Sequence, residues 1–312
     1  MQALDKALNI VHLKNHEVNT IKWDTAIANA VNGMPYAYSW YLDIVHPEWE
    51  ALVADDYSYV MPLTCNKKLA ISYLFQPLFT QQLGVFSTEE LSPNLIELML
   101  DAIPKKYRFI EINLNTFNKL DRYLHYSNPR LTYQMDLVQN YPKLHEKYSY
   151  NARRNLRKSE KNGLYGVEGM SAHELINFYK ENIGSDSIKH KPEDYDTLKR
   201  LIISAIRFRV GYTYGVYDKN NTLLSAAFYL HTHGKTILLI LVSSKEGKTL
   251  GAGFYLVDKY IKINAEKNIV LDFEGSMLPG VARFYAGFGA KPYKYPSVKI
   301  NNLPFPFRFL KK

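Results

Sequence analysis

The residues with the clearest chemical potential form a glycine-rich segment in the last quarter of the chain. An apolar run from Ile237 to Val242 is typical of one buried strand, and Gly247-Lys248-Thr249-Leu250-Gly251-Ala252-Gly253 follows it after a polar turn. Apolar residues then recur at three- and four-residue steps through Glu266, which predicts a helix. Glycines let a ligand approach the backbone closely, and a helix start offers unpaired N–H groups and a positive dipole end. The segment is therefore suited to phosphates, unless its glycines simply make a tight turn.

Two carboxylates end the next predicted strand. Ile269–Phe273 reads as a buried strand that contains Asp272 and is followed directly by Glu274. A short predicted helix then carries Tyr285, and the chain returns to a strand near residue 290. Because a carboxylate can take a proton directly or through water, both acids are candidate general bases, and Glu274 is preferred to Asp272.

Three motifs in this part of the chain resemble motifs of the GNAT acyltransferases. Lys248-x-x-Gly251-Ala252-Gly253 is similar to their pyrophosphate loop, with lysine in place of glutamine or arginine. Tyr285-Ala286-Gly287-Phe288-Gly289 is similar to their Y-x-x-F/L-G segment. Asp272-Phe273-Glu274-Gly275 is similar to the segment after the matching strand in Fem-type aminoacyl transferases, a tandem branch of the same fold.

The resemblance implies an N-acyltransferase that moves an acyl group from an acyl-CoA, such as acetyl-CoA, to an amine. It implies that Lys248 and the amides of Gly251–Gly253 hold the donor pyrophosphate. Strand-edge atoms near Val242 and Ser243 would pair with the pantetheine arm of the donor. Tyr285 would be the general acid that protonates the departing thiolate.

Two other functions remain open. A Fem-type transferase would take its acyl group from aminoacyl-tRNA and act on a cell-wall precursor or a similar acceptor. A catalytically inactive GNAT-like binding module is the third possibility, because lysine replaces the usual loop residue and the motifs do not fix the base. The expected partners are thus a small-molecule or peptide-like anionic acceptor and, in the Fem-type case, tRNA.

The most basic segment of the chain spans residues 148–163 and has helical spacing, with Gly163 as its stop. Arg153 and Arg157 fall on one face, and Arg154 and Lys158 on the adjacent one. Such a run can be an ordinary solvated face, but arginine forks fit carboxylate and phosphate oxygens. We therefore expect these four residues to bind the acceptor, which predicts an acceptor that carries a phosphate or a carboxylate.

Charge and composition indicate the kind of ligand and the cellular compartment. Residues 1–139 hold 11 Lys+Arg and 15 Asp+Glu, whereas residues 140–312 hold 28 and 15, so anionic ligands are expected in the second half. The single cysteine, Cys65, excludes an internal disulfide framework and suits a reducing compartment. We see neither a signal peptide nor a stretch of about 18 apolar residues, and the histidines lack ligand spacing. These features predict a cytoplasmic protein without a membrane span or a metal site.

The element order predicts an α/β protein built from tandem GNAT-like domains, each a mixed, mostly antiparallel sheet flanked by helices. The first half shows strands at 8–13, 49–53, 57–63, 69–74, 108–114 and 131–138, with helices at 21–31, 39–45 and 89–103. The second half shows strands at 164–168, 211–217, 223–231, 237–242 and 269–273, with helices at 172–183 and 193–208. We expect domains at 1–138 and 164–312, joined by a basic linking helix at 139–163. Only the second domain carries the donor-binding motifs.

Overall fold

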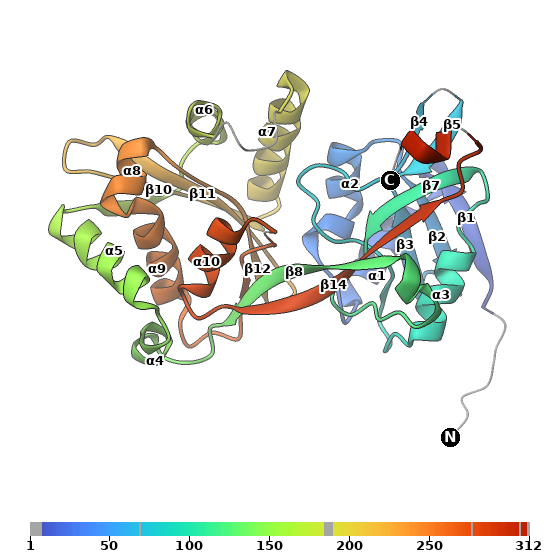
Figure 1. Cartoon of the computed structure of the whole chain (residues 1–312), viewed down its shortest axis with the longest axis horizontal. Helices are drawn as coiled ribbons and strands as arrows, with labels where there is room; N and C mark the ends of the chain where they lie inside the picture. Colours follow the sequence, from blue (N-terminus) through green and yellow to red (C-terminus); the bar gives the residue numbers. More distant parts are fainter. Residues whose placement is uncertain (1–7, 69, 184–189, 276, 306, 311–312) are drawn as a thin grey trace. The chain divides into compact units, whose positions relative to one another are not determined.

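The computed structural model describes residues 8–68, 70–183, 190–275, 277–305 and 307–310. The chain divides into two compact units, one formed by residues 1–130 together with 294–312, the other by residues 131–293 (Figure 1). The basic segment that the sequence suggested as a link lies inside the second unit, and the end of the chain belongs to the first. That each unit is a copy of one fold stays a prediction.

The first unit contains two sheets and three α-helices among its described residues. One sheet has the antiparallel order β1-β2-β3-β6. In the other, β4 pairs with β5, β5 runs parallel to β7, and β7 is antiparallel to the end of β14. The elements are β1 (Ile10–Lys14), α1 (Thr20–Asn29), α2 (Ser39–Val45), β2 (Glu50–Ala54), β3 (Tyr59–Leu63), β4 (Cys65–Lys68), β5 (Ile71–Leu74), β6 (Phe86–Ser87), α3 (Pro93–Asp101), β7 (Tyr107–Asn113) and β14 (Lys291–Asn301), with 3₁₀ turns at Asn15–Glu17, Pro35–Ala37, Arg122–Tyr126 and Phe307–Leu310.

The second unit is built on one sheet with the order β8-β13-β12-β11-β10-β9. All neighbours in it are antiparallel except β12 and β13, which run parallel. Its elements are β8 (Ser127–Asp136), α4 (Tyr141–Glu146), α5 (Tyr150–Lys161), β9 (Tyr165–Glu168), α6 (Ala172–Asn182), α7 (Pro192–Arg207), β10 (Gly211–Tyr217), β11 (Leu223–Thr232), β12 (Lys235–Ser243), α8 (Lys245–Leu250), α9 (Ala252–Asn264), β13 (Val270–Asp272) and α10 (Pro279–Ala286).

Helix α9 is the central helix of this unit. Its buried face contains Leu256, Val257, Tyr260 and Ile261, and it packs on β10, β11 and β12. The Tyr260 ring stacks on Tyr229 of β11 with 4.1 Å between ring centroids. In Figure 1, α5 and α10 lie beside α9, while α6 and α7 lie across the strands from it. The apolar spacing that predicted this helix therefore reflects its packing against the sheet.

Only the first three residues of β12 pair with strand β13. They pair from Lys235 with Val270 to Ile237 with Asp272, after which β13 ends and β12 continues to Ser243. Near the point where they part, Tyr229 of β11 faces Leu238 and Phe228 faces Ile240, so Leu239 is an extra residue in β12. Such a bulge bends and twists its strand. Among the residues that the structure describes, no strand pairs with the last part of β12 on the β13 side.

Candidate functional site

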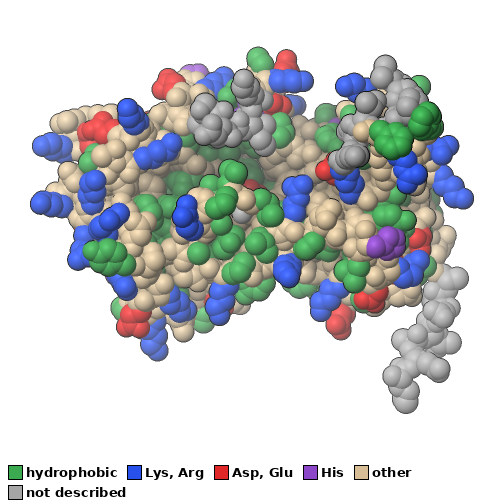
Figure 2. Space-filling model, viewed as in Figure 1, with side chains coloured by type: hydrophobic (Ala, Val, Ile, Leu, Met, Phe, Trp, Pro, Cys, Tyr) green, Lys and Arg blue, Asp and Glu red, His purple; other side chains and the backbone are tan. Residues whose placement is uncertain are grey.

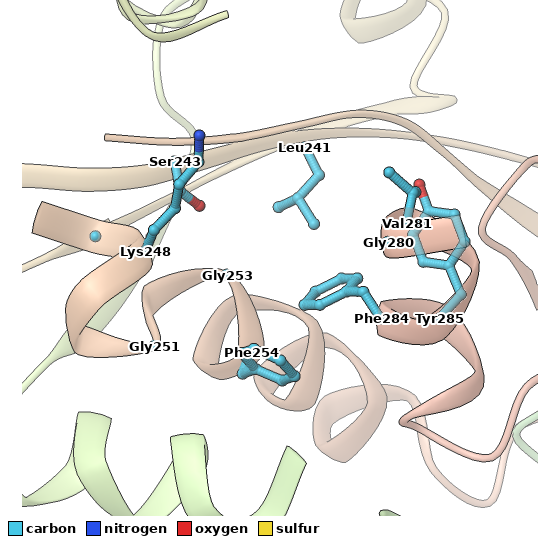
Figure 3. A pocket seen from close by; sticks show the side chains of 11 residues that line it. Leu241, Ser243, Lys248, Gly251, Gly253, Phe254, Gly280, Val281, Phe284 and Tyr285 are labelled. Carbon is cyan, nitrogen blue, oxygen red and sulfur yellow. The ribbon is translucent and has the colours of Figure 1, made fainter. Parts of the chain in front are cut away.

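A cavity of about 340 Å³ lies beside the unpaired end of β12, within the second unit. Figure 3 shows Lys248 and Ser243 on one side of it and Tyr285 and Val281 on the other, with Leu241 between them. Three elements supply its walls: the end of β12, the junction of α8 and α9, and α10. The complete lining is Leu241, Ser243, Gly247, Lys248, Gly251, Gly253, Phe254, Gly280, Val281, Phe284 and Tyr285.

The glycine-rich segment is a pair of helices with a sharp turn between them. The sequence predicted one helix beginning in the segment, but α8 starts earlier, where the Ser244 side chain accepts a hydrogen bond from the Gly247 N–H at 2.9 Å. Gly251 then takes a left-handed φ of 78°, and α9 begins at Ala252. No side chain in the described part of the chain caps this helix start. The first N–H groups of α9, which lie beside the cavity, therefore have no side-chain partner among the described residues.

Gly251 and Gly253 serve different purposes in this turn. A Cβ on Gly251 would lie 2.7 Å from the backbone oxygen of Asn155, so this glycine lets α5 approach the turn closely. A Cβ on Gly253 would lie 3.2 Å from the Ser243 hydroxyl and 4.0 Å from both the Phe284 ring and the Ser225 hydroxyl, and this glycine lines the cavity. Lys248 is exposed on α8 at the same end of the cavity, while Ala252 is fully buried. Gly253 is thus the residue whose missing side chain keeps the helix start open.

Of the two predicted strand-edge residues, Ser243 lines the cavity and Val242 does not. The Val242 side chain is buried, and its carbonyl accepts a hydrogen bond from the Ser225 hydroxyl at 2.9 Å. Ser225 also lies 2.9 Å from the Ser243 hydroxyl, so the two serines are hydrogen-bonded at the end of β12. The hydroxyl of Ser243 is the polar side-chain group that β12 presents to the cavity.

Tyr285 lies at the other end of the cavity, on α10. Its ring centroid is 5.0 Å from that of Phe273 and 6.2 Å from that of Tyr133. Its hydroxyl makes no hydrogen bond to any residue that the structure describes. Burial raises the pKa of the Tyr285 phenol above its usual value near 10, and the negative charges of Glu274 and Asp272 raise it further. The phenol is therefore protonated at neutral pH.

The two candidate bases have different surroundings. Asp272 is only 3% exposed, and its carboxylate accepts hydrogen bonds from the Thr132 hydroxyl at 2.5 Å and the Gln134 amide at 2.8 Å. Lys235 lies 3.6 Å from the same carboxylate. Glu274 is half-buried and has a left-handed φ of 59°. Neither acid lines the cavity, but the charges of both reach the Tyr285 phenol.

The predicted basic helix is α5, which packs against α8 and α9. Its two basic faces point to different places. Arg154 donates to the Asn151 side chain at 3.0 Å, and Asn151 lines a hollow of about 690 Å³ that shares Phe254, Gly280 and Phe284 with the cavity. Arg153 and Arg157 instead line a separate groove of about 440 Å³ with Tyr141, His145, Leu156 and Glu160. Neither Arg154 nor Lys158 lines the cavity or the hollow, and Arg154 is connected to the hollow only through Asn151.

The cations around α5 are largely unpaired. Figure 2 shows Lys and Arg side chains gathered over the part of this unit that carries α5 and α8. Within the described residues, none of the seven basic residues of segment 140–163 forms an ion pair; they are Lys143, Lys147, Arg153, Arg154, Arg157, Lys158 and Lys161. A surface with this charge is suited to an anionic ligand.

Sequence reasoning missed several residues that line the cavity or the adjoining hollow. Phe254 belonged to the apolar face of the predicted helix, and Phe284 and Arg283 lay in the predicted short helix, but nothing in their spacing marked them as site residues. Gly280 lines both spaces, and a Cβ there would meet no atom within 4 Å. The Pro279-Gly280 pair was a turn signal that could have drawn attention to it.

Comparisons with known proteins bear on the fold. No family model matches the chain, and no curated protein matches it by sequence. Among solved structures, FemX is similar over 94% of this chain and 98% of its own, with a TM-score of 0.62 and 13% sequence identity.

Two further structures are similar over most of their length. The C-terminal domain of a putative lysylphosphatidylglycerol synthetase from Agrobacterium fabrum covers 95% of each chain, with a TM-score of 0.55 and 9% identity. L-PGS from Bacillus licheniformis matches 84% of this chain and 87% of its own, with a TM-score of 0.51 and 11% identity. At such identities the likeness concerns the fold. The chain has a fold similar to that of FemX, which agrees with the Fem-type resemblance of its motifs.

Proposed function

We propose that the protein is an acyltransferase that moves an acyl group from a phosphate-bearing carrier to an amine. One observation carries this proposal. A single cavity has the start of α9, without a side-chain cap, at one end and the Tyr285 hydroxyl at the other, and this hydroxyl has no hydrogen-bond partner among the described residues. The helix start suits the phosphates of a donor, and the phenol can donate a proton to a leaving group.

Acyl-CoA, with acetyl-CoA as the simplest case, is our first choice of donor. The N–H groups at Ala252 and Gly253 and the ammonium of Lys248 would hold the pyrophosphate. The end of β12 at Ser243, which has no strand partner on the β13 side within the described ranges, offers backbone groups to the amides of a pantetheine arm. The cavity between Leu241 and Tyr285 would receive the thioester.

The residues support a direct transfer. The acceptor nitrogen would attack the thioester carbonyl carbon, forming a C–N bond, and the C–S bond would break. Tyr285 would give its phenolic proton to the departing sulfur, and Glu274 would accept the proton that the acceptor nitrogen loses, directly or through water. Solvent would then return a proton to Tyr285 and take one from Glu274.

Glu274 is a better base than Asp272 in this arrangement. The Asp272 carboxylate already accepts hydrogen bonds from Thr132, Gln134 and the Glu274 backbone N–H. Its buried position also keeps it from meeting an amine. Glu274 is half-buried, comes two residues later in the chain and lies near Tyr285.

A second candidate is an aminoacyl-tRNA donor, which the unpaired cations of α5 favour. RNA presents a long row of phosphates, and basic surfaces bind such rows electrostatically. The similarity to FemX and to a domain of a putative lysylphosphatidylglycerol synthetase is consistent with aminoacyl transfer. In this case a C–O ester bond would break in place of the C–S bond, and Tyr285 would protonate the ribose oxygen. An inactive binding module remains the outcome if neither donor reacts.

The separate groove beside α5 is our candidate for the acceptor-binding site. We propose that Arg153 and Arg157 bind a carboxylate or phosphate of a small-molecule or peptide-like acceptor, whereas Arg154 and Lys158, on the other face, contact the donor. The lone cysteine fits a reducing compartment, so we place the reaction in the cytoplasm. None of the helices in the described ranges is long and apolar enough to cross a bilayer.

A variant of Gly253 tests the donor site. Gly253→Val places a side chain at the start of α9, and we expect it to abolish binding of coenzyme A in calorimetry while the melting temperature stays close to that of the parent. Thr249→Val, at an exposed position of α8, is the matched control and should bind normally. The same titrations with charged and uncharged tRNA separate the two donors. Equal affinity of the Gly253→Val and parent proteins for every donor would contradict this site.

A further inference from the structure

The buried Asp272 carboxylate is held by four partners. One carboxylate oxygen, Oδ1, accepts the Thr132 hydroxyl at 2.5 Å and the Glu274 backbone N–H at 2.9 Å. The other, Oδ2, accepts the Gln134 amide at 2.8 Å and lies 3.6 Å from the Lys235 ammonium. These partners come from β8, β12 and the segment that follows β13, so a single buried carboxylate fixes the end of β13 on both sides.

What this carboxylate fixes is an unusual backbone conformation at Glu274. Its φ of 59° lies in a region that residues with a Cβ rarely adopt. Glycine would take this conformation without strain, and Gly275 stands one residue later. The chain instead has a glutamate there, and its N–H points back to Asp272. Strain of this kind persists where the surroundings fix it and is often found at functional sites.

The neighbouring backbone completes the arrangement. Tyr133 of β8 donates its N–H to the Glu274 carbonyl at 3.2 Å and accepts from the Phe273 N–H at 2.9 Å. The rings of Tyr133 and Phe273 both lie against Tyr285. The segment that carries Glu274 is therefore the same segment that packs against the proposed general acid.

We infer that Asp272 is a positioning residue: it holds Glu274 in its left-handed turn, so that the Glu274 carboxylate faces the Tyr285 end of the cavity. This assignment rests on the proposed function, because it gives Glu274 the role of base. It differs from a purely structural role for Asp272, in which the carboxylate would stabilise the sheet and affect catalysis only through folding.

A double-mutant cycle separates these roles. Asp272→Asn keeps one oxygen for the Thr132 hydroxyl and the Glu274 N–H, and Gln134 can turn its own amide to meet the new NH₂ group. We expect Asp272→Asn alone to lower kcat by roughly 10- to 100-fold, as a small misplacement of a reacting group does. In a Glu274→Gln background the same change should alter kcat by less than about 2-fold, because the group it positions is gone. Independent, multiplicative losses would overturn the inference.

Two milder variants cover the case in which Asp272→Asn fails to fold. Thr132→Val removes a hydrogen bond to Oδ1, the oxygen that holds Glu274, and should lower kcat more than KM, again only while Glu274 is present. Lys235→Met removes the charge beside Oδ2 and is the matched control, with an expected change in kcat of less than about 2-fold. If Lys235→Met and Thr132→Val lower kcat equally, Asp272 acts through general stabilisation of the sheet.

The outcomes also distinguish this inference from the proposed function. If the parent protein transfers no acyl group from acetyl-CoA or aminoacyl-tRNA to any amine, the proposed function fails. If the parent is active and Glu274→Gln keeps its full kcat at every pH between about 6 and 9, the function stands and the positioning role of Asp272 is wrong. Loss of the acidic limb of the kcat profile in Glu274→Gln, and its displacement in Thr132→Val, would support the inference.

Discussion

At Tyr285 the ring is fixed and the hydroxyl is left to a ligand. Phe273, Phe284 and Tyr133 surround the ring with centroid separations of 5.0, 5.8 and 6.2 Å. The residue is half-buried, and its hydroxyl has no hydrogen-bond partner within the described residues. The ring contacts therefore fix the position of the phenol oxygen and leave its proton free to turn toward a ligand, as a general acid requires.

Removal of that hydroxyl is the most direct test at this scale. Tyr285→Phe keeps the ring contacts and should lower kcat by about 10²–10⁴-fold while the calorimetric affinity for the donor stays the same. Tyr293→Phe, at an exposed position of the same unit, is the control. An unchanged kcat would assign the proton to another group.

The pH profile gives an independent measurement of the same residue. Because burial and the nearby carboxylates raise the pKa of the Tyr285 phenol, it should keep its proton throughout the neutral and mildly alkaline range. We expect ionisation of Tyr285 to cause no fall in the parent kcat below about pH 10. The kcat profiles of the parent and of Tyr285→Phe should therefore have the same shape up to that pH. A decline near about pH 8 that disappears in the variant would mean that the phenol has a lowered pKa.

At the scale of elements, the junction of α8 and α9 depends on Gly251. Its φ is left-handed, and a Cβ there would lie only 2.7 Å from the Asn155 backbone oxygen, so the turn has no space for a side chain. Gly251→Ala should lower the free energy of unfolding by about 1–3 kcal/mol through backbone strain alone, and by more if α5 must move. Denaturant unfolding measures this, with Gly280→Ala as the control that meets no atom. Equal stability of both variants would show that the turn adapts.

Helices α4 and α9 are joined through Asp258. The Tyr141 hydroxyl contacts both carboxylate oxygens, at 2.9 and 3.1 Å. Burial raises the pKa of this carboxyl above its usual 3.8, although the tyrosine hydrogen bonds and nearby cations act against the shift. A raised folded-state pKa means that the contribution of Asp258 to stability is full below its unfolded-state pKa and is lost as the pH rises through the folded-state value.

The substitution Asp258→Asn removes this titration. Relative to the variant, the parent should lose stability as the pH is raised from about 3.5 to 7, measured as the difference between their melting temperatures. His173→Asn, exposed on α6, provides a comparison at a distant surface position. A parent that gains stability over Asp258→Asn across this range would show that the hydrogen bonds outweigh burial.

Elements with a clear local signal were predicted well. Helix α2 and strand β10 have the bounds that the sequence suggested, and the helix predicted at 172–183 is α6, where Ser171 accepts a hydrogen bond from the Glu174 N–H at 3.1 Å. Helix α3 was placed too early: its cap is Ser92, and Pro93 sets its first turn. Strand β4 was missed because its polar sequence, Cys65–Lys68, is exposed on one edge.

The positions of site residues could be predicted where a sequence motif specifies the local backbone. They could not be predicted where tertiary packing determines the backbone conformation. The spacing of the motifs singled out the glycines and Tyr285, and the structure places them around one cavity; their roles stay predictions. The bulge at Leu239 and the break at Gly251 could not be found, because an unbroken apolar run carries no sign of an extra residue and a left-handed glycine looks like any loop glycine. The division of the α5 cations between two spaces depends on how that helix packs, which its own sequence does not specify.

For the molecule as a whole, charge is the property most relevant to its ligands. The net charge is +9, and the second half of the chain carries the excess. A positive field raises the association rate of anions in general. Specific contacts act mainly by lowering the dissociation rate. A decrease in affinity after a charge is removed is therefore ambiguous unless a variant of equal net charge is compared with it.

The two faces of α5 provide such a pair. Arg154→Gln with Lys158→Gln and Arg153→Gln with Arg157→Gln each remove two positive charges from one helix, so their effects on the overall field are closely matched. We expect the first pair to raise the donor KM and the second to raise the acceptor KM, by roughly 2- to 30-fold for two exposed contacts of about 0.2–1 kcal/mol each. Each affected KM should also become less sensitive to salt. Equal effects of both pairs on both substrates would show that α5 acts through net charge alone, and that neither face forms a binding site.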